Sequence, residues 1–293
     1  MRYDLTLRIE YDYGAAAPSA RNVLRVAPRR IDGVQSVENV RLEISPDPAE
    51  IRHRVDFWGN SVAGMSFHEP LRKLTARLSA RVERLARPPT LDLTPRRAGL
   101  ASEIAARRGL GPDEPHHFRA PSPRVGPDPG IADFAETSVA PDMTVLGSVL
   151  ALGRAIHGHM RFDAAATTVD TAPSEAFAAR HGVCQDFTHV MIAGLRSLGI
   201  PAGYVSGYLR TTPPKGRPRL QGADAMHAWV RAWCGTEAGW VEYDPTNDLL
   251  VGVDHIVVAV GRDYSDVAPV KGSLRTSGRQ MSKHSVDLVP LDS

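Results

Sequence analysis

The first part of the chain alternates apolar and polar positions. Between residues 3 and 12 every odd position is aliphatic or aromatic and every even position is polar or charged. This alternation predicts a strand with one buried and one solvated face. Residues 51–57 repeat it and are predicted to bury Ile51, Val55 and Phe57. The stretch Leu71 to Leu85 fits both strand and helix spacing, so its pattern alone leaves the choice open.

A helical pattern follows later in the chain. From Phe187 to Leu198 apolar residues recur three and four positions apart, as on a helix with one buried face. Gly199 and Pro201 form the matching stop signal. Cys184 then lies in or just before the first turn, where unpaired N–H groups and the helix dipole favour thiolate over thiol. The same N–H groups could hold an oxyanion. A second helical stripe, over residues 146–160, is predicted to pack beside this helix.

Two strand-like runs, 225–234 and 239–245, are joined by four residues and predict an antiparallel hairpin. Strand alternation puts Cys234 on the face opposite His227, so a disulfide with Cys184 is not expected. Pairing Cys234 with Trp240 would also put Asp244 on the face opposite His227. We therefore expect either a bulge in the hairpin or a bend at Asp244 before the following proline.

Cys184, His227 and Asp244, in this order, supply a thiol nucleophile, its base and a group that orients the base. Each residue alone has a simpler explanation. The cysteine could be a small buried apolar residue, the histidine a strand residue with its polar atoms satisfied, and the aspartate a turn residue before proline. The ordered occurrence of all three favours catalysis.

These motifs carry a family resemblance. The run from Gly182 to Leu209, then DAMHAWVRAWC (224–234) and GWVEYDPTND (239–248), resembles bacterial transglutaminase-like proteins of the papain-like cysteine-enzyme superfamily. The resemblance extends to the N-terminal β domain, about residues 3–85, which favours a strand for 71–85, and to GRDYSDVAP at 261–269. One departure is Met226, where a small residue, often serine, is expected.

The resemblance implies that Cys184 is the acylated nucleophile, His227 the general base and acid, and Asp244 the orienting carboxylate. It also implies an α+β fold. We predict an N-terminal antiparallel β sandwich-like domain (1–87), a connection rich in proline and glycine (88–130) with a short helix near 98–108, and a papain-like, transglutaminase-like core (131–293). In that core the catalytic helix packs on an antiparallel sheet.

Six further residues are candidates for supporting roles. Asp186 and His189 are three residues apart and close on a helix surface, where a local ion pair and a direct role in catalysis are equally plausible. Trp229 and Met226 are candidates for a substrate groove, although core packing is the stronger expectation for the tryptophans. The last two are expected to brace the site from behind: Arg262 and Asp263.

Composition narrows the class of protein. The 293 residues are 42% hydrophobic, enough for a substantial core, and 35 basic against 33 acidic residues leave a net charge of +2. This balance gives no electrostatic reason to expect a nucleic-acid partner. Two cysteines cannot form a tetrahedral cysteine site for zinc, and no His-Glu-x-x-His motif occurs, so we expect no metal and no organic cofactor.

Location and reaction follow as expectations. No apolar run approaches the roughly 20 residues that span a bilayer, and no export signal is recognised at the start, so we expect a cytoplasmic protein without a membrane partner. The expected substrate is a peptide or protein with an amide or glutamine carbonyl. Hydrolysis is the preferred outcome. The alternatives are transfer to an amine, as in a protein-glutamine gamma-glutamyltransferase, and a non-catalytic interaction protein that retains the fold.

Overall fold

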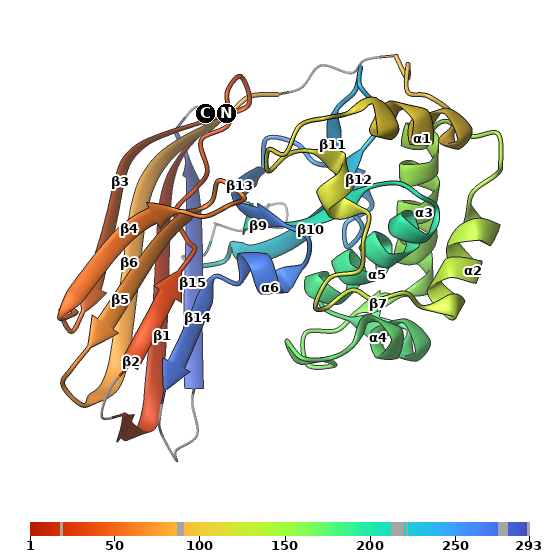
Figure 1. The fold of residues 1–293 in the computed structure, drawn as a ribbon. Helices are drawn as coiled ribbons and strands as arrows, with labels where there is room; N and C mark the ends of the chain where they lie inside the picture. The colour runs from red at the N-terminus through yellow and green to blue at the C-terminus, as the bar shows by residue number, and fades with distance from the viewer. Residues whose placement is uncertain (18–19, 87–90, 212–219, 221, 275–280, 292–293) are drawn as a thin grey trace.

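Strands from both ends of the chain build a β sandwich (Figure 1). The computed structural model describes residues 1–17, 20–86, 91–211, 220, 222–274 and 281–291. One antiparallel sheet has the order β15-β1-β6-β3 and the other β14-β2-β5-β4. The first comprises β15 (Met281–Pro290), β1 (Arg2–Ala17), β6 (Leu71–Arg84) and β3 (Gln35–Ser45). The second comprises β14 (Val270–Leu274), β2 (Ala20–Leu24), β5 (Ser61–Phe67) and β4 (Glu50–Val55).

The predicted alternation at the start of the chain is confirmed in β1. Leu5 and Leu7 are buried in the sandwich, whereas Thr6 and Arg8 are exposed. The segment that fitted two patterns is the strand β6, in which Leu78 pairs with Leu7. In residues 51–57 the strand was predicted correctly but its burial was wrong. Every residue of β4 is exposed, and β4 is the last strand of its sheet, with a neighbour on one side only.

The last two strands join sheets that N-terminal residues begin. β14 pairs with β2, and β15 pairs with β1 along ten residue pairs, from Tyr3 opposite Pro290 to Asp12 opposite Met281. Residues 270–274 and 281–290, predicted as part of the C-terminal domain, therefore complete the N-terminal sandwich. The predicted boundary at residues 87 and 88 lies outside the described residues, and the division into domains stays a prediction.

A second layer contains the sheet β12-β11-β10-β9-β13. Its strands are β9 (Ala202–Leu209), β10 (Ala225–Trp233), β11 (Trp240–Asp244), β12 (Leu249–Leu250) and β13 (His255–Gly261). Helices pack on one face and the β sandwich on the other (Figure 1). Coverage on both faces explains why β9 and β13 read as nearly continuous apolar runs and not as alternating strands.

Helices on the far side of this sheet surround α5 (Cys184–Ser197), which contacts both β9 and β10. The predicted helix over 146–160 is α3 (Val145–His159), and it packs beside α5 as expected. The remaining elements are α1 (Arg97–Ala106), the 3-10 helix η1 (Pro115–Phe118), α2 (Pro129–Ser138), β7 (Arg161–Phe162), α4 (Pro173–Ala179), β8 (His181–Gly182) and α6 (Tyr264–Val267). No helix among the described residues has the length and apolarity to cross a bilayer.

Two side-chain amides join the sandwich to the core sheet. Gln35 donates to the carbonyl of Val257 (2.8 Å) and accepts from its N–H (2.9 Å). Asn60 makes the same two contacts with Val260, at 2.9 and 2.8 Å. Because β13 is the last strand of its sheet, these amides satisfy backbone groups that an edge strand would leave unpaired. The contacts also fix β13 against the sandwich.

The hairpin has a different register from the predicted one. Trp233, not Cys234, lies opposite Trp240, and the ladder continues to Val230 opposite Tyr243 without a bulge. Asp244 is still in strand conformation and pairs with Leu249, so the expected bend before proline is also absent from this part of the structure. A shift of one residue changes the face of every side chain. It places Asp244 on the same face as His227.

Candidate active site

The start of α5 is held by a buried carboxyl group. Asp186 Oδ2 accepts hydrogen bonds from the Val183 backbone N–H (2.8 Å) and from the Thr167 hydroxyl (2.6 Å). A Cβ on Gly182 would lie 2.5 Å from the same oxygen, so only glycine fits there. Burial raises the pKa of Asp186, although these two hydrogen bonds oppose it. This residue therefore shapes the turn that presents Cys184.

Cys184 is the first residue of α5, as the sequence predicted, and it is partly exposed. Asp186 and Phe187 donate the first backbone hydrogen bonds of the helix, both to the carbonyl of Val183. The N–H groups of Cys184 and Gln185 precede these bonds and have no acceptor within the helix. They are therefore available beside the sulfur atom.

His227 lies between Cys184 and Asp244. Its Nε2 is 2.7 Å from Asp244 Oδ2, and the Cys184 side chain lies close enough to the ring to raise its pKa. Since Nε2 faces the carboxylate, Nδ1 is the ring nitrogen left for the thiol. Burial alone would lower the pKa of His227, but the hydrogen bond to Asp244 and the nearby Cys184 side chain outweigh it and raise the pKa to about 10.

The Asp244 carboxylate accepts five hydrogen bonds and is fully buried. Oδ2 accepts hydrogen bonds from Nε2 of His227 (2.7 Å), from Nε2 of His255 (3.1 Å) and from the side-chain amide of Asn247 (2.7 Å). Oδ1 receives the backbone N–H groups of Thr246 (3.0 Å) and Asn247 (3.2 Å). Burial would raise the pKa of Asp244, but these donors hold it far below its usual range. The carboxylate is thus ionised and fixed in orientation.

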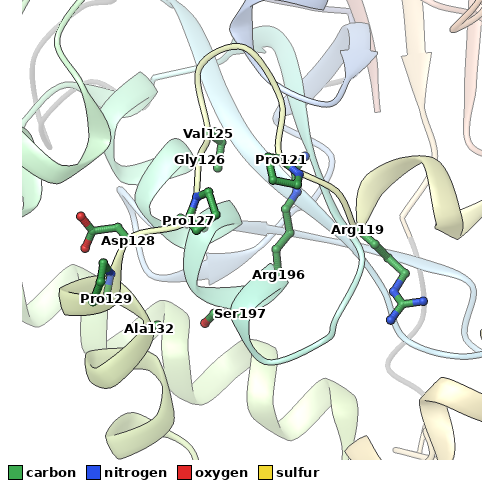
Figure 2. A pocket seen from close by; sticks show the side chains of 11 residues that line it. Arg119, Pro121, Val125, Gly126, Pro127, Asp128, Pro129, Ala132, Arg196 and Ser197 are labelled. Carbon is green, nitrogen blue, oxygen red and sulfur yellow. The ribbon is translucent and has the colours of Figure 1, made fainter.

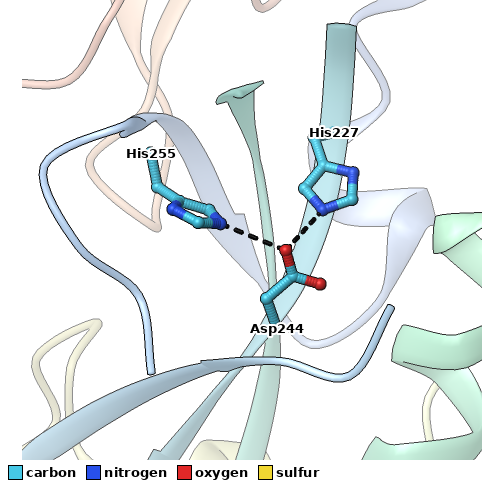
Figure 3. Close-up of side chains that lie close together, drawn as sticks. All are labelled: His227, Asp244 and His255. Atoms are coloured by element: carbon cyan, nitrogen blue, oxygen red, sulfur yellow. Dashed lines mark hydrogen bonds and ion pairs between the residues drawn. The ribbon is translucent and has the colours of Figure 1, made fainter. Parts of the chain in front are cut away.

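Sequence reasoning missed His255. It opens β13, whose other residues are apolar or glycine, and it reaches Asp244 from a strand that is not a neighbour of β11 in the sheet. Figure 3 shows both imidazoles directed at the same carboxylate oxygen. A lone histidine at the start of an apolar, buried strand was the available signal.

These three side chains could also be considered as metal ligands, since one ligand atom of each lies within 4.8 Å of the other two. Their separations of 2.7 and 3.1 Å to Oδ2 are hydrogen-bond lengths. A zinc ion bonded to both nitrogens at about 2 Å would take the place of the protons that these contacts need. The geometry fits a hydrogen-bonded group better than a metal centre.

A second buried histidine lies on α5 itself. His189 Nε2 accepts a hydrogen bond from the backbone N–H of Tyr264 (3.2 Å), and its ring packs on Tyr204. Burial lowers the pKa of His189 to about 4, so this ring is neutral near pH 7. Its polar partners differ from those of Asp186, so of the two alternatives for this pair the local ion pair is not found among the described residues.

Asp263 and Arg262 follow β13 and act on the segment that carries Tyr264. Asp263 is fully buried and accepts from the backbone N–H groups of Arg124 (2.7 Å) and Ser265 (2.8 Å). Arg262 pairs with Asp266 at 2.9 Å. Both brace the backbone that contacts His189.

The prediction that Trp229 lines a substrate groove is wrong. Its ring is fully buried, packs edge-on against His255 and donates its indole N–H to Glu242 (3.3 Å). It belongs to the core, and its contact with His255 supports the triad from behind. Met226 is partly exposed and stays a candidate for contact with substrate. Cys234 is free and fully buried, which agrees with the predicted absence of a disulfide.

A cavity of about 290 Å³ lies at the opposite end of α5. Figure 2 shows it between the loop 119–129 and the last turn of the helix, where Arg196 and Ser197 line it. The guanidinium of Arg196 is occupied by the carbonyls of Ala202 and Arg262 and the hydroxyl of Ser122. None of the lining residues is Cys184, His227 or Asp244, so this cavity is separate from the candidate active site.

The sequence of this chain is similar to known protein families. Residues 132–245 match the transglutaminase-like superfamily, and residues 3–83 match the bacterial transglutaminase-like N-terminal region. An uncharacterized protein of Mycobacterium tuberculosis is 35% identical over 304 residues, covering 99% of this chain and 93% of its own length. The chain belongs to the transglutaminase-like superfamily. An uncharacterized Mycobacterium leprae protein is 33% identical over 266 residues, with 89% of each chain covered.

A solved structure supports the fold of this transglutaminase-like protein. A protein from Cytophaga hutchinsonii, described there as a candidate cysteine protease, aligns with a TM-score of 0.73 at 21% identity. The alignment covers 100% of this chain and 91% of the other. At this identity the likeness establishes the fold, and the activity has to be argued from the site.

Proposed function

We propose that the protein is a cysteine-dependent amide acyl-transfer enzyme that acts mainly as a hydrolase on peptide or protein substrates. One observation carries the proposal: the imidazole of His227 is 2.7 Å from a buried, ionised Asp244 carboxylate and has the Cys184 side chain close enough to raise its pKa. A fixed negative charge on one side of the ring favours the imidazolium, and the imidazolium stabilises a thiolate on the other side.

The proposed reaction begins when the Cys184 thiolate attacks the amide carbonyl carbon. The carbonyl oxygen becomes an oxyanion, which the N–H groups of Cys184 and Gln185 can stabilise. As the C–N bond breaks, His227 gives its proton to the departing amine, leaving a thioester on Cys184. Neutral His227 then takes a proton from water, the hydroxyl attacks the thioester, and release of the carboxylic acid restores the thiolate–imidazolium pair.

Transfer to an amine is the second candidate, because an amine can attack the same thioester and leave a new amide. The partial exposure of Cys184 is compatible with both acceptors. It also argues against the third candidate, a non-catalytic protein that only retains the fold, since an occluded sulfur would favour that alternative. The superfamily membership and the fold are equally compatible with the three candidates.

The test follows acyl transfer by mass spectrometry. The protein is incubated with a mixture of glutamine-containing peptides in ¹⁸O-water, with and without methylamine. We expect ¹⁸O in new carboxyl groups as the main product, and a methylamide as the minor one. Cys184→Ala should abolish both products, whereas Cys234→Ala, the matched change at the buried cysteine, should leave both. Equal product with wild type and Cys184→Ala would contradict the proposal, and a dominant methylamide would replace hydrolysis by transfer.

A further inference from the structure

His255 is a fourth buried polar residue in contact with the candidate triad. Its side chain is 4% exposed, and its Nε2 lies 3.1 Å from Asp244 Oδ2, the oxygen that also faces His227. A carboxylate can only accept, so Nε2 of His255 carries the proton of this hydrogen bond. Nδ1 of the same ring is buried and has no hydrogen-bond partner within the part of the chain that the structure describes. His255 is therefore used in one direction only, as a donor to Asp244.

The ring of His255 is itself held in place. Trp229 packs against it edge-on, with ring centroids 5.1 Å apart and an angle of 84° between the planes. Trp229 is fixed in turn by its hydrogen bond to Glu242. The backbone of β13 is anchored through β9 and through the two side-chain amides from the sandwich. The Nε2–H donor of His255 is therefore held on a strand that is fixed in place.

The five donors to Asp244 have different origins. Thr246 and Asn247 follow Asp244 in the same turn, so their contacts move with it. His227 is the group to be oriented. His255 alone among the five belongs to β13 and ties the carboxylate to a strand two positions away from β10 in the sheet. It fixes where Oδ2 lies relative to the His227 ring.

We propose that His255 is a positioning residue for the catalytic carboxylate, so that the working unit is Cys184–His227–Asp244–His255. The proposal rests on the proposed Cys184–His227 pair. Loss of the Nε2–H donor would let the carboxylate rotate in its pocket, and the His227 ring would follow it away from the sulfur. Because His255 touches neither sulfur nor substrate, it acts only through Asp244.

A matched pair of variants tests this role. His255→Gln places an amide N–H close to the position of Nε2 and can still donate to Asp244. His255→Asn carries the same amide but ends near the position of Nδ1 and cannot reach the carboxylate. Both leave the hole of a lost imidazole, so their stabilities should fall together. Any difference between them reports the hydrogen bond to Asp244.

The readout is the rate of Cys184 alkylation by iodoacetamide at pH 6 divided by the rate at pH 9.5, with thermal unfolding in parallel. At pH 6 reaction depends on thiolate made by the pair with His227, whereas at pH 9.5 solvent hydroxide also produces thiolate. We expect His255→Asn to lower this ratio about tenfold and His255→Gln to keep it within about threefold of wild type.

Two results would overturn the proposal, and they have different meanings. If wild type reacts rapidly at pH 6 and both variants keep its ratio, or both lose it equally, His255 has only a structural role and the proposed function stands. If wild type itself reacts slowly at pH 6, with the same low ratio in all three proteins, the activated thiolate is absent and the proposed function fails together with the role of His255.

Discussion

Two buried histidines beside the start of α5 show how partners decide protonation. His227 faces an ionised carboxylate, and its pKa is raised to about 10. His189 accepts a backbone N–H from Tyr264, and its pKa is lowered to about 4. Both rings are almost inaccessible to solvent. Burial disfavours the charge on both, so the difference arises from a charged acceptor on one side and an N–H donor on the other.

The two histidines lie in two different clusters of side chains. The triad cluster comprises Cys184, His227, Asp244 and His255, and the His189 cluster comprises His189, Tyr204, Asp263 and Tyr264. The triad cluster holds charge that the proposed chemistry uses. The His189 cluster stays neutral at its centre and fixes the segment after β13 against α5. In this account, comparable burial serves the proposed chemistry in one cluster and positioning in the other.

The largest expected effect is a difference in activity between variants of His227 and His189. His227→Gln should lower the rate of ¹⁸O incorporation at least about a thousandfold, because the amide cannot exchange a proton with sulfur or leaving group. His189→Gln should stay within about tenfold of wild type, since the glutamine Oε1 can still accept the Tyr264 N–H. Equal losses in the two variants would show that the clusters do not divide the work as described.

The second largest expected effect is a difference in activity between variants of the two buried carboxylates, Asp244 and Asp263. Asp244→Asn should lower the same rate by about 10²- to 10⁴-fold, because an amide removes the negative charge and can present an N–H to the ring. Asp263→Asn removes a carboxylate that accepts from the backbone N–H groups of Arg124 and Ser265 and from the side chain of Ser122, and not from an imidazole of the triad cluster. It should cost stability, read from thermal unfolding, with less than a tenfold change in rate. A reversed order of the two rates would contradict the assignment of Asp244.

The pH dependence of stability sharpens the contrast further. The lowered pKa of His189 means that the unfolded chain binds more protons than the folded one between about pH 4 and 6.5. Stability should therefore fall by about 3 kcal/mol as the pH drops through this range, and His189→Gln should flatten that slope. Urea unfolding at several pH values measures both. An unchanged slope in the variant would mean that His189 does not titrate there.

Within the triad cluster, His227 predicts the opposite dependence, whereas Asp244 predicts the same direction as His189. The raised pKa of His227 gives stability that is fully present below the ordinary histidine pKa and is lost as the pH rises through about 10. The lowered pKa of Asp244 gives stability that is present above the ordinary aspartate pKa and is lost in acid. In His227→Gln, urea unfolding should show a weaker loss of stability between pH 6.5 and 10. A loss as large as that of wild type would contradict the ion pair.

The smallest effect concerns Trp229, which supports His255 from the core. Trp229→Phe keeps an aromatic ring but loses the indole N–H to Glu242, so it should cost about 1 kcal/mol of stability. The rate of ¹⁸O incorporation should change less than threefold, because the ring is buried and does not line a groove. A specific rise in the substrate KM would instead return Trp229 to the substrate site.

The sequence was most informative where a local pattern and a fixed order of motifs coincided. The helical spacing after Phe187 and the stop at Gly199, whose φ is +79°, placed Cys184 at the start of α5 correctly. The hairpin was predicted correctly as well, but its register was wrong by one residue. Turn geometry sets the register, and the connection, with positive φ at Gly235 and Gly239, pairs Trp233 with Trp240.

Long-range contacts account for what sequence reasoning missed. His255 reaches Asp244 only because β13 pairs with β9 on the far side of β10, and no local pattern announces that order of strands. The alternation in the sequence of β4 predicted a buried face, but no part of the described structure covers either face of this strand at the end of its sheet. Tertiary contacts, not local propensity, decided both.

The central claim is that His227 and Asp244 activate Cys184. The most direct measurement is the alkylation rate of Cys184 by iodoacetamide from pH 5 to 10, in wild type and His227→Ala, with mass spectrometry resolving it from the buried Cys234. The account predicts fast modification of Cys184 well below pH 8 that is lost in His227→Ala, with Cys234 protected throughout. Slow modification of Cys184 below pH 8, unchanged by removal of the imidazole, would contradict it.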